Sequence, residues 1–209
     1  MLKRIFGGLS RHQPAPAPAI TPTITIVSGL PRSGTSLMMR MLEAGGIPPV
    51  TDHERSADED NPGGYYEFER VKQMEKGDIA WLADAAGKAV KVISLLLRSL
   101  PDGYHYNVIF MERDLGEVLA SQRKMLENRA EAADAVNDEQ MQALFTKHLT
   151  DIRQWLAAQP NFAVLYVNYS DLLTNPEPQV EKLVAFFEGT LDGAAMIEVI
   201  DPTLYRNRG

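Results

Sequence analysis

The fold of this chain is decided by the stretch Ile24-Thr-Ile-Val-Ser-Gly29-Leu-Pro-Arg-Ser-Gly34-Thr-Ser36. A β-branched apolar run leads into a short loop with glycines five residues apart, and apolar residues at helical spacing follow. In such a layout, backbone N–H groups of the loop and of the helix N-terminus converge on an oxyanion. The pattern is close to G-x-x-x-x-G-K-[ST], but Thr35 replaces the lysine and Arg32 is the loop's only cation. The sequence predicts a phosphate-binding loop without the usual ATP chemistry.

Composition and charge limit the function classes. The 209 residues are 44% hydrophobic, which suits one domain over residues 21–209 behind a flexible Pro/Ala-rich lead-in over residues 1–20. A net charge of −7 argues against nucleic acid or anionic membranes as partners. The chain has no cysteine, and no apolar run approaches the roughly 20 residues of a membrane span. We predict a cytoplasmic enzyme.

Strand-like and helix-like patterns alternate along the chain. Four β-branched or apolar runs are predicted as strands, at residues 23–28, 88–94, 107–112 and 162–167. Helical patterns lie between and after them, at residues 37–42 (stopping at Gly45), 67–86, 115–126, 141–156 and 176–187. Such alternation predicts an α/β, P-loop-type three-layer α/β/α fold with a central, mostly parallel sheet. The polar residues 47–66 are broken by Pro and Gly, and we expect this loop to shape an acceptor pocket.

Three segments together resemble the sulfotransferase family. They are the loop Gly29–Ser36, the segment Val108–Ser121 with an arginine and a serine eight residues later, and the segment Val167–Pro176 before an apolar helix. The Pro-Arg pair is similar to the branch that contains tyrosylprotein sulfotransferases and many bacterial members. The resemblance implies transfer of a sulfuryl group from 3′-phosphoadenosine 5′-phosphosulfate to a hydroxyl or amine, leaving adenosine 3′,5′-bisphosphate, with no metal. It does not identify the acceptor, which is a small molecule, a glycan or a peptide.

The resemblance also implies roles for individual residues. The loop residues would bind the 5′ end of the donor, with Arg32 also stabilising the leaving phosphate: Arg32, Ser33, Gly34, Thr35 and Ser36. Arg113 and Ser121 would grip the 3′-phosphate, and Arg113 follows a parallel strand, where open α/β sheets bind ligands. The alternative is that Arg113 only pairs with Asp114 or Glu117 and that Ser121 is a surface residue. Lys91 would either contact the sulfuryl oxygens or simply lie at a strand edge. Arg206 and Arg208 resemble a basic C-terminal segment that holds the 3′-phosphate, although such tails are also common solvated endings.

The general base is the point where this sequence departs from the family. Many members place a histidine soon after the lysine that Lys91 matches, and here no histidine follows it. Glu67, His53 and Glu54 are the candidates, because other branches supply a glutamate shortly after the phosphate loop. Glu67 is equally consistent with a first-turn carboxylate favoured by the helix dipole. His148 lies on an apolar helical stripe and is interpreted as structural.

Two other functions stay open from the sequence. In a P-loop kinase or NTPase, Glu112 at the end of the third predicted strand would bind magnesium. The missing loop lysine and the arginine directly after Glu112 argue against that interpretation. A catalytically inactive nucleotide-binding protein is the other alternative, and the oligomeric state is not predicted.

Overall fold

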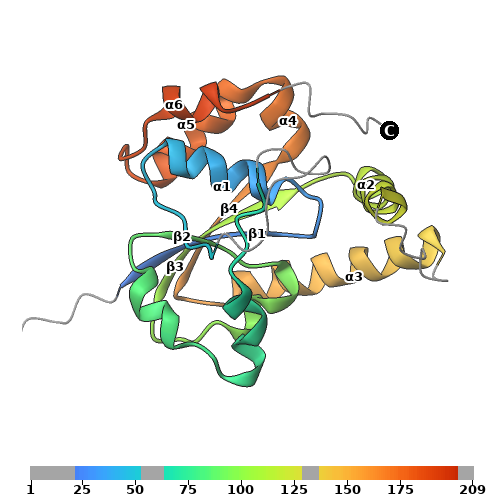
Figure 1. Cartoon of the computed structure of the whole chain (residues 1–209), viewed down its shortest axis with the longest axis horizontal. Helices are drawn as coiled ribbons and strands as arrows, with labels where there is room; N and C mark the ends of the chain where they lie inside the picture. Colours follow the sequence, from blue (N-terminus) through green and yellow to red (C-terminus); the bar gives the residue numbers. More distant parts are fainter. Residues whose placement is uncertain (1–21, 53–63, 129–136, 202–209) are drawn as a thin grey trace, which may run out of the picture.

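A four-stranded, all-parallel sheet is the centre of the computed structural model, which describes residues 22–52, 64–128 and 137–201 (Figure 1). The strand order is β2-β1-β3-β4. The bounds are Thr23–Gly29 for β1, Ala89–Lys91 for β2, His105–Glu112 for β3 and Phe162–Asn168 for β4. All three pairings are parallel, so the carboxyl ends of the strands share one edge. The predicted α/β class and parallel sheet are confirmed.

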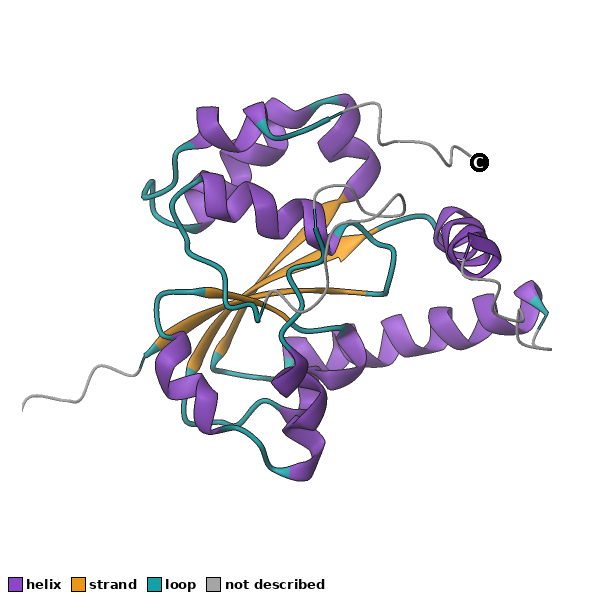
Figure 2. Ribbon diagram, in the orientation of Figure 1, coloured by secondary structure: helices purple, strands orange, loops and turns teal. Residues whose placement is uncertain are grey.

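Helices cover both faces of the sheet and give three layers (Figure 2). The first face carries α1 (Thr35–Ala44), α4 (Tyr169–Thr174), α5 (Pro176–Phe186) and α6 (Gly193–Glu198). The second carries α3 (Asp138–Ala157) and three 3₁₀ helices, η1 (Glu69–Lys76), η2 (Ala80–Ala85) and η3 (Ser94–Ser99). Helix α2 (Leu115–Asn128) follows β3 at the carboxyl edge of the sheet.

The central strand β1 explains this layering. Its side chains alternate between the faces: Ile24 and Ile26 pack with the α3 layer, whereas Val27 packs with the α1 layer. All three are fully buried. A strand covered on both faces reads as a continuous apolar run instead of an alternating one. This is why residues 23–28 are so easily recognised in the sequence.

The structure corrects two predicted boundaries. Residues 67–86 were expected to form one helix, but they form η1 and η2, because Gly77 takes a left-handed φ of +90° and ends η1. Strand β2 ends at Lys91 instead of residue 94, since Ser94 begins η3. The lead-in over residues 1–20 lies outside the described residues.

Candidate functional site

The predicted phosphate loop connects β1 to α1 and is shaped by two glycines. Gly29 has a φ of +144°, and a Cβ there would lie 2.7 Å from the Met111 carbonyl oxygen on β3. Gly34 has a φ of +98°, and a Cβ there would lie 2.3 Å from the ring of Tyr169. Distances this short are forbidden for real atoms, so both positions require glycine. The loop is therefore held tightly against β3 and against the start of α4.

We expect Gly34→Ala to destabilise the protein more than Gly46→Ala. Both glycines have positive φ values, which cost a non-glycine residue about 1–3 kcal/mol, but a Cβ on Gly46 would meet nothing within 4 Å. The Gly46 variant thus measures the backbone cost alone, and Gly34→Ala adds the clash with Tyr169. Urea denaturation measures both free energies of unfolding. Equal losses in the two variants would contradict the tight packing of the loop.

Arg32, Arg113 and Ser121 meet at the carboxyl edge of the sheet. The Arg32 Nε donates to the Ser121 hydroxyl at 3.0 Å, across 89 residues of sequence. The Arg113 guanidinium donates to the Arg32 carbonyl oxygen at 3.0 Å. Arg32 itself has a left-handed φ of +70°, which is uncommon for a residue with a side chain. The three predicted phosphate-binding residues thus form one cluster from the loop, the end of β3 and α2.

Arg113 is fixed by two further contacts. Its Nε donates to Glu117 at 2.8 Å, and the two side chains are only 7% and 8% exposed. Its guanidinium carbon lies 4.5 Å from the centre of the Tyr169 ring, within cation–π range. Sequence reasoning did not single out Tyr169, although its place directly after β4 puts it at the same sheet edge as the loop. Both contacts hold the guanidinium beside the phosphate loop.

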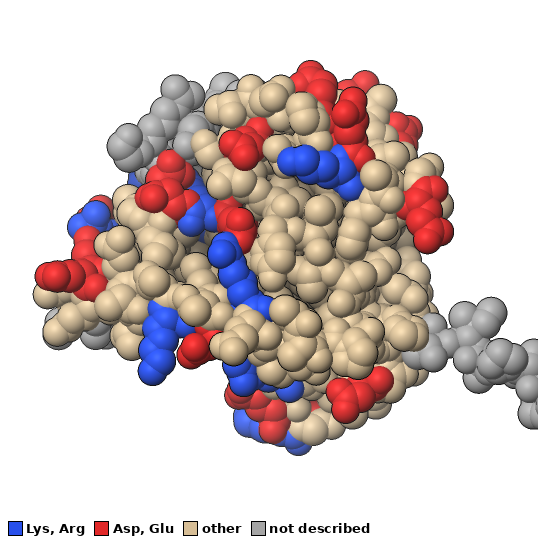
Figure 3. All heavy atoms as spheres, turned by 180° about the vertical axis from the view of Figure 1, so that it is seen from behind, with Lys and Arg blue, Asp and Glu red and all other residues tan. Residues whose placement is uncertain are grey.

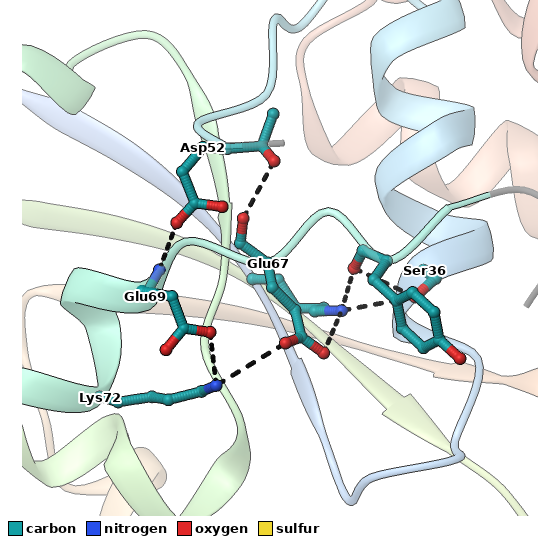
Figure 4. A network of polar contacts seen from close by, with 8 residues as sticks. Ser36, Asp52, Glu67, Glu69 and Lys72 are labelled. Carbon is teal, nitrogen blue, oxygen red and sulfur yellow. Dashed lines mark hydrogen bonds and ion pairs between the residues drawn. The ribbon is translucent and has the colours of Figure 1, made fainter. Parts of the chain in front are cut away.

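A second polar cluster surrounds Lys91 at the end of β2 (Figure 4). Its ammonium donates to the Tyr65 carbonyl oxygen and lies 3.4 Å from the Ser36 hydroxyl on α1. Glu67 lies between two lysines, 3.9 Å from the Lys91 ammonium and 3.7 Å from that of Lys72. The structure thus brings the predicted residues Ser36, Lys91 and Glu67 together, with Glu67 ion-paired.

The backbone around Glu67 is held from two sides. The Thr51 hydroxyl donates to the Glu67 carbonyl oxygen at 2.9 Å, and the Glu69 amide donates to Asp52 at 2.6 Å (Figure 4). On the other side, the Tyr66 hydroxyl donates to Glu43 on α1 at 2.5 Å. Burial, with Glu43 beside it, raises the pKa of Tyr66 to about 12, so this phenol stays a neutral donor. Residues 64–68 are therefore fastened to both α1 and residues 51–52.

Two buried serine hydroxyls and a small cleft lie beside the phosphate loop. Ser28 Oγ and Ser33 Oγ are buried and have no hydrogen-bond partner among the residues that the structure describes. A small cleft lies between the loop and α3, and its lining includes Leu30, Ser33 and Leu149. A buried hydroxyl without a partner costs free energy, so Ser33 is suited to donate to a bound oxyanion.

The remaining predicted residues fall into two groups. His53, Glu54, Arg206 and Arg208 lie outside the described residues. Glu112, the residue that a kinase would use for magnesium, accepts a hydrogen bond from Arg153 on α3. Within the described parts of the chain, no group of three or more His, Cys, Asp or Glu side chains could hold a metal ion. Beside the loop, the described residues place the two arginines Arg32 and Arg113.

Acidic and basic side chains share the surface that Figure 3 shows. On the face shown in Figure 3, acidic and basic side chains are interspersed, and no broad basic stripe is present there. No described helix has both the length and the apolar character that crossing a bilayer requires.

Comparison with known proteins decides the family. A family model described as the sulfotransferase domain matches residues 22–207. The chain belongs to the sulfotransferase family. No curated protein matches this sulfotransferase.

Two solved structures are similar to this sulfotransferase. One is the sulfotransferase domain from the curacin biosynthetic pathway, with 14% sequence identity and a TM-score of 0.48. The match covers 86% of this chain and 78% of the curacin domain. The other is the sulfotransferase domain from the Synechococcus PCC 7002 olefin synthase, also with 14% sequence identity and with a TM-score of 0.47. The match covers 90% of this chain and 84% of the olefin synthase domain.

Proposed function

We propose that this sulfotransferase uses 3′-phosphoadenosine 5′-phosphosulfate as its donor. The observation that carries the proposal is the cluster of Arg32, Arg113 and Ser121, in which two guanidinium groups and a hydroxyl from three elements adjoin the phosphate loop. The buried Ser33 hydroxyl also supports binding of this nucleotide to the loop, because it would gain a hydrogen-bond partner in a phosphate oxygen. In the proposal, the loop binds the 5′ end, and Arg113 and Ser121 bind the 3′-phosphate.

The chemistry that these residues supply is electrostatic. An acceptor oxygen or nitrogen attacks the sulfur while the bond from sulfur to the 5′-phosphate oxygen breaks, so negative charge grows on that phosphate. Arg32, the loop amides and the N-terminus of α1 would stabilise this charge, with Thr35 and Ser36 as further donors. Lys91 lies beside Ser36 and would contact the sulfuryl oxygens. Because fixed guanidinium groups supply the positive charge, we propose that the reaction needs no metal.

The proposal also covers the acceptor group, the location of the enzyme and the base. The proposal extends to a hydroxyl or an amine as the acceptor group, without naming the molecule that carries it. A cytoplasmic location stays a prediction from the sequence. Glu67 stays a predicted base, and its ion pair with Lys91 also suits it to orient that lysine.

Calorimetry tests the proposed donor against the kinase alternative. In buffer with EDTA, adenosine 3′,5′-bisphosphate should bind the protein. In a separate titration without EDTA, ATP with magnesium should bind far more weakly. The Arg123→Ala variant is a suitable control for variants of Arg32, Arg113 and Ser121, and it should bind the bisphosphate like the parent protein. Arg123 is on α2 two residues after Ser121, but its side chain is 55% exposed. Tight, magnesium-dependent ATP binding without bisphosphate binding would reject the proposal.

We expect Lys91→Met to slow sulfuryl transfer by about 100-fold, the usual effect of losing one donor to a developing charge. The rate is measured as labelled sulfate released from the donor into water. Lys72→Met is the matched control, because Lys72 contacts the same Glu67 carboxylate but its side chain is 55% exposed. A similar loss of rate in both variants would show that the rate depends on the Glu67 ion pairs. That result would contradict a contact between Lys91 and the sulfuryl group.

A further inference from the structure

One arginine of α1 is half-buried without an ion pair. Arg40 lies four residues after Ser36, and its Nε atom is buried and has no hydrogen-bond partner among the described residues. No carboxylate in the described part of the chain lies within ion-pair distance of its guanidinium. Withdrawing a charged group from water without such partners costs free energy. Arg40 is therefore suited to a ligand that supplies a negative charge.

Arg40 lies on the side of α1 that faces away from the core. Six of the ten helix residues are buried, and Ser36, Arg40 and Glu43 are among those that are not. These three residues recur at i, i+4 and i+7, which places them on one side of the helix. We call this row the open side of α1. Because four residues rise about 6 Å along a helix, Arg40 is about one turn from Ser36 and from the phosphate loop.

Residues 64–68 contact the open side of α1 at two points. The Ser36 hydroxyl donates to the Tyr65 carbonyl oxygen at 3.3 Å (Figure 4). The Tyr66 hydroxyl donates to the Glu43 carboxylate at 2.5 Å. One contact is thus about a turn before the arginine along α1, and the other is about a turn after it. The arginine is bracketed by contacts to the same segment.

Tyr66 is the residue of this segment that interacts with Arg40. Burial and Glu43 raise the pKa of Tyr66, whereas the charge of Arg40 lowers it, so the two side chains are near enough to interact. Tyr66 also has a left-handed φ of +51°, which is uncommon for an aromatic residue. Residues in such a conformation are frequent at ligand-binding sites. The backbone bend and the unpaired arginine therefore occur together.

The same segment joins Arg40 to the place proposed for sulfuryl transfer. The Lys91 ammonium donates to the Tyr65 carbonyl oxygen and lies 3.4 Å from the Ser36 hydroxyl. Lys91 is thus at the Ser36 end of the open side of α1, where the sulfuryl group would lie, and Arg40 is one helical turn further along. An acceptor that reacts beside Lys91 can extend along this side and meet the arginine.

We propose that Arg40 binds a carboxylate of the acceptor, so that the enzyme sulfates a hydroxyl or amine on a molecule that also carries an acid group. This inference rests on the proposed function. A guanidinium holds a carboxylate through two parallel hydrogen bonds. A carboxylate suits the site better than a phosphate dianion, because one arginine balances one charge and Glu43 lies three residues further along the same side. Arg40 takes no part in bond making.

Two phenols that differ by one charge test the proposal. 4-Hydroxyphenylacetate has a hydroxyl and a carboxylate at opposite ends of a ring, and 4-hydroxyphenylacetamide has nearly the same shape without the charge. Transfer of labelled sulfate from 3′-phosphoadenosine 5′-phosphosulfate to each phenol gives the two kcat/KM values. The parent protein should prefer the carboxylate by about 10- to 100-fold, the effect of one or two charge-assisted hydrogen bonds.

Variants of Arg40 should change this preference and little else. Arg40→Met should remove it by raising KM for the carboxylate, with the rate for the amide within about twofold of the parent value. Arg40→Lys keeps the charge but not the two parallel hydrogen bonds, so it should retain part of the preference. Arg98→Met is the matched control, because Arg98 is exposed on η3, in the layer on the other face of the sheet. It should keep the preference of the parent protein.

Thermal denaturation distinguishes a binding role from a structural role. Arg40→Met keeps an apolar stem but removes the half-buried charge, so its Tm without ligands should equal or exceed that of the parent protein. With adenosine 3′,5′-bisphosphate at saturation, 4-hydroxyphenylacetate should raise the Tm of the parent protein, because it binds only the folded state. It should leave the Tm of Arg40→Met unchanged. These measurements need no turnover.

Different results overturn the inference and the proposed function. The inference fails if the parent protein transfers no more sulfate to the carboxylate than to the amide, or if Arg98→Met loses the preference as fully as Arg40→Met. It also fails if Arg40→Met melts well below the parent protein, or if 4-hydroxyphenylacetate does not shift the Tm of the saturated parent protein. A protein that does not bind adenosine 3′,5′-bisphosphate would instead contradict the proposed function.

Discussion

Replacement of Arg32 by alanine should slow release of labelled sulfate from the donor by about 100- to 1000-fold. Arg32 is the only cation of the phosphate loop, and its backbone is fixed through the hydrogen bond from Arg113 to its carbonyl oxygen. Its side chain would therefore act on the leaving phosphate from a fixed point. The loss should appear mainly in kcat, because the charge that Arg32 stabilises develops only in the transition state.

The matched control for this result is Arg123→Ala, which also removes one positive charge near Ser121 but from an exposed side chain paired with Asp138. It should leave the rate within about twofold of the parent value, since exposed ion pairs contribute little. An Arg32→Ala rate close to that of Arg123→Ala would contradict the role of the loop arginine.

Arg113→Ala should destabilise the protein by about 3–5 kcal/mol and also abolish measurable bisphosphate binding. The Arg113 and Glu117 side chains form an ion pair that is almost fully buried. Removal of the arginine leaves the Glu117 carboxylate without that partner in a poorly solvated place. Urea denaturation measures the loss of stability, and calorimetry measures the loss of binding.

The double variant Arg113→Ala/Glu117→Gln separates the two effects. It removes the buried charge as well, so most of the stability should return, whereas the bisphosphate affinity should not. A double variant that regains binding together with stability would show that Arg113 acts only through folding. That result would remove the 3′-phosphate site from the account.

The parts of the fold that were predicted well depend on local signals. The run over residues 23–28 and the two loop glycines are explained by burial on both faces and by positive φ values at Gly29 and Gly34. Residues 67–86 were predicted less well, because Gly77 lies within an otherwise helical pattern and its left-handed conformation divides the segment into η1 and η2.

The contacts of the candidate site could not be predicted from the sequence. Arg32 and Ser121 are 89 residues apart, and only the resemblance to a family suggested that both bind the same ligand. Tyr169 was missed because an aromatic residue after a strand is usually part of the core. The hydrogen bond between His148 and Ser94 could not be predicted, because one side of α3 both packs on the sheet, through Ile152, and reaches Ser94. Periodicity reports which side of a helix is apolar and cannot report which polar group lies opposite.

The central claim is that the site binds the two phosphates of one adenosine nucleotide in two adjoining places. The most direct measurement compares adenosine 3′,5′-bisphosphate with adenosine 5′-monophosphate by calorimetry in EDTA. Charge-assisted hydrogen bonds to the extra phosphate contribute about 1.5–3 kcal/mol each, so the bisphosphate should bind at least about tenfold more tightly. Ser121→Ala should reduce this difference. Equal affinities for the two nucleotides would contradict the account.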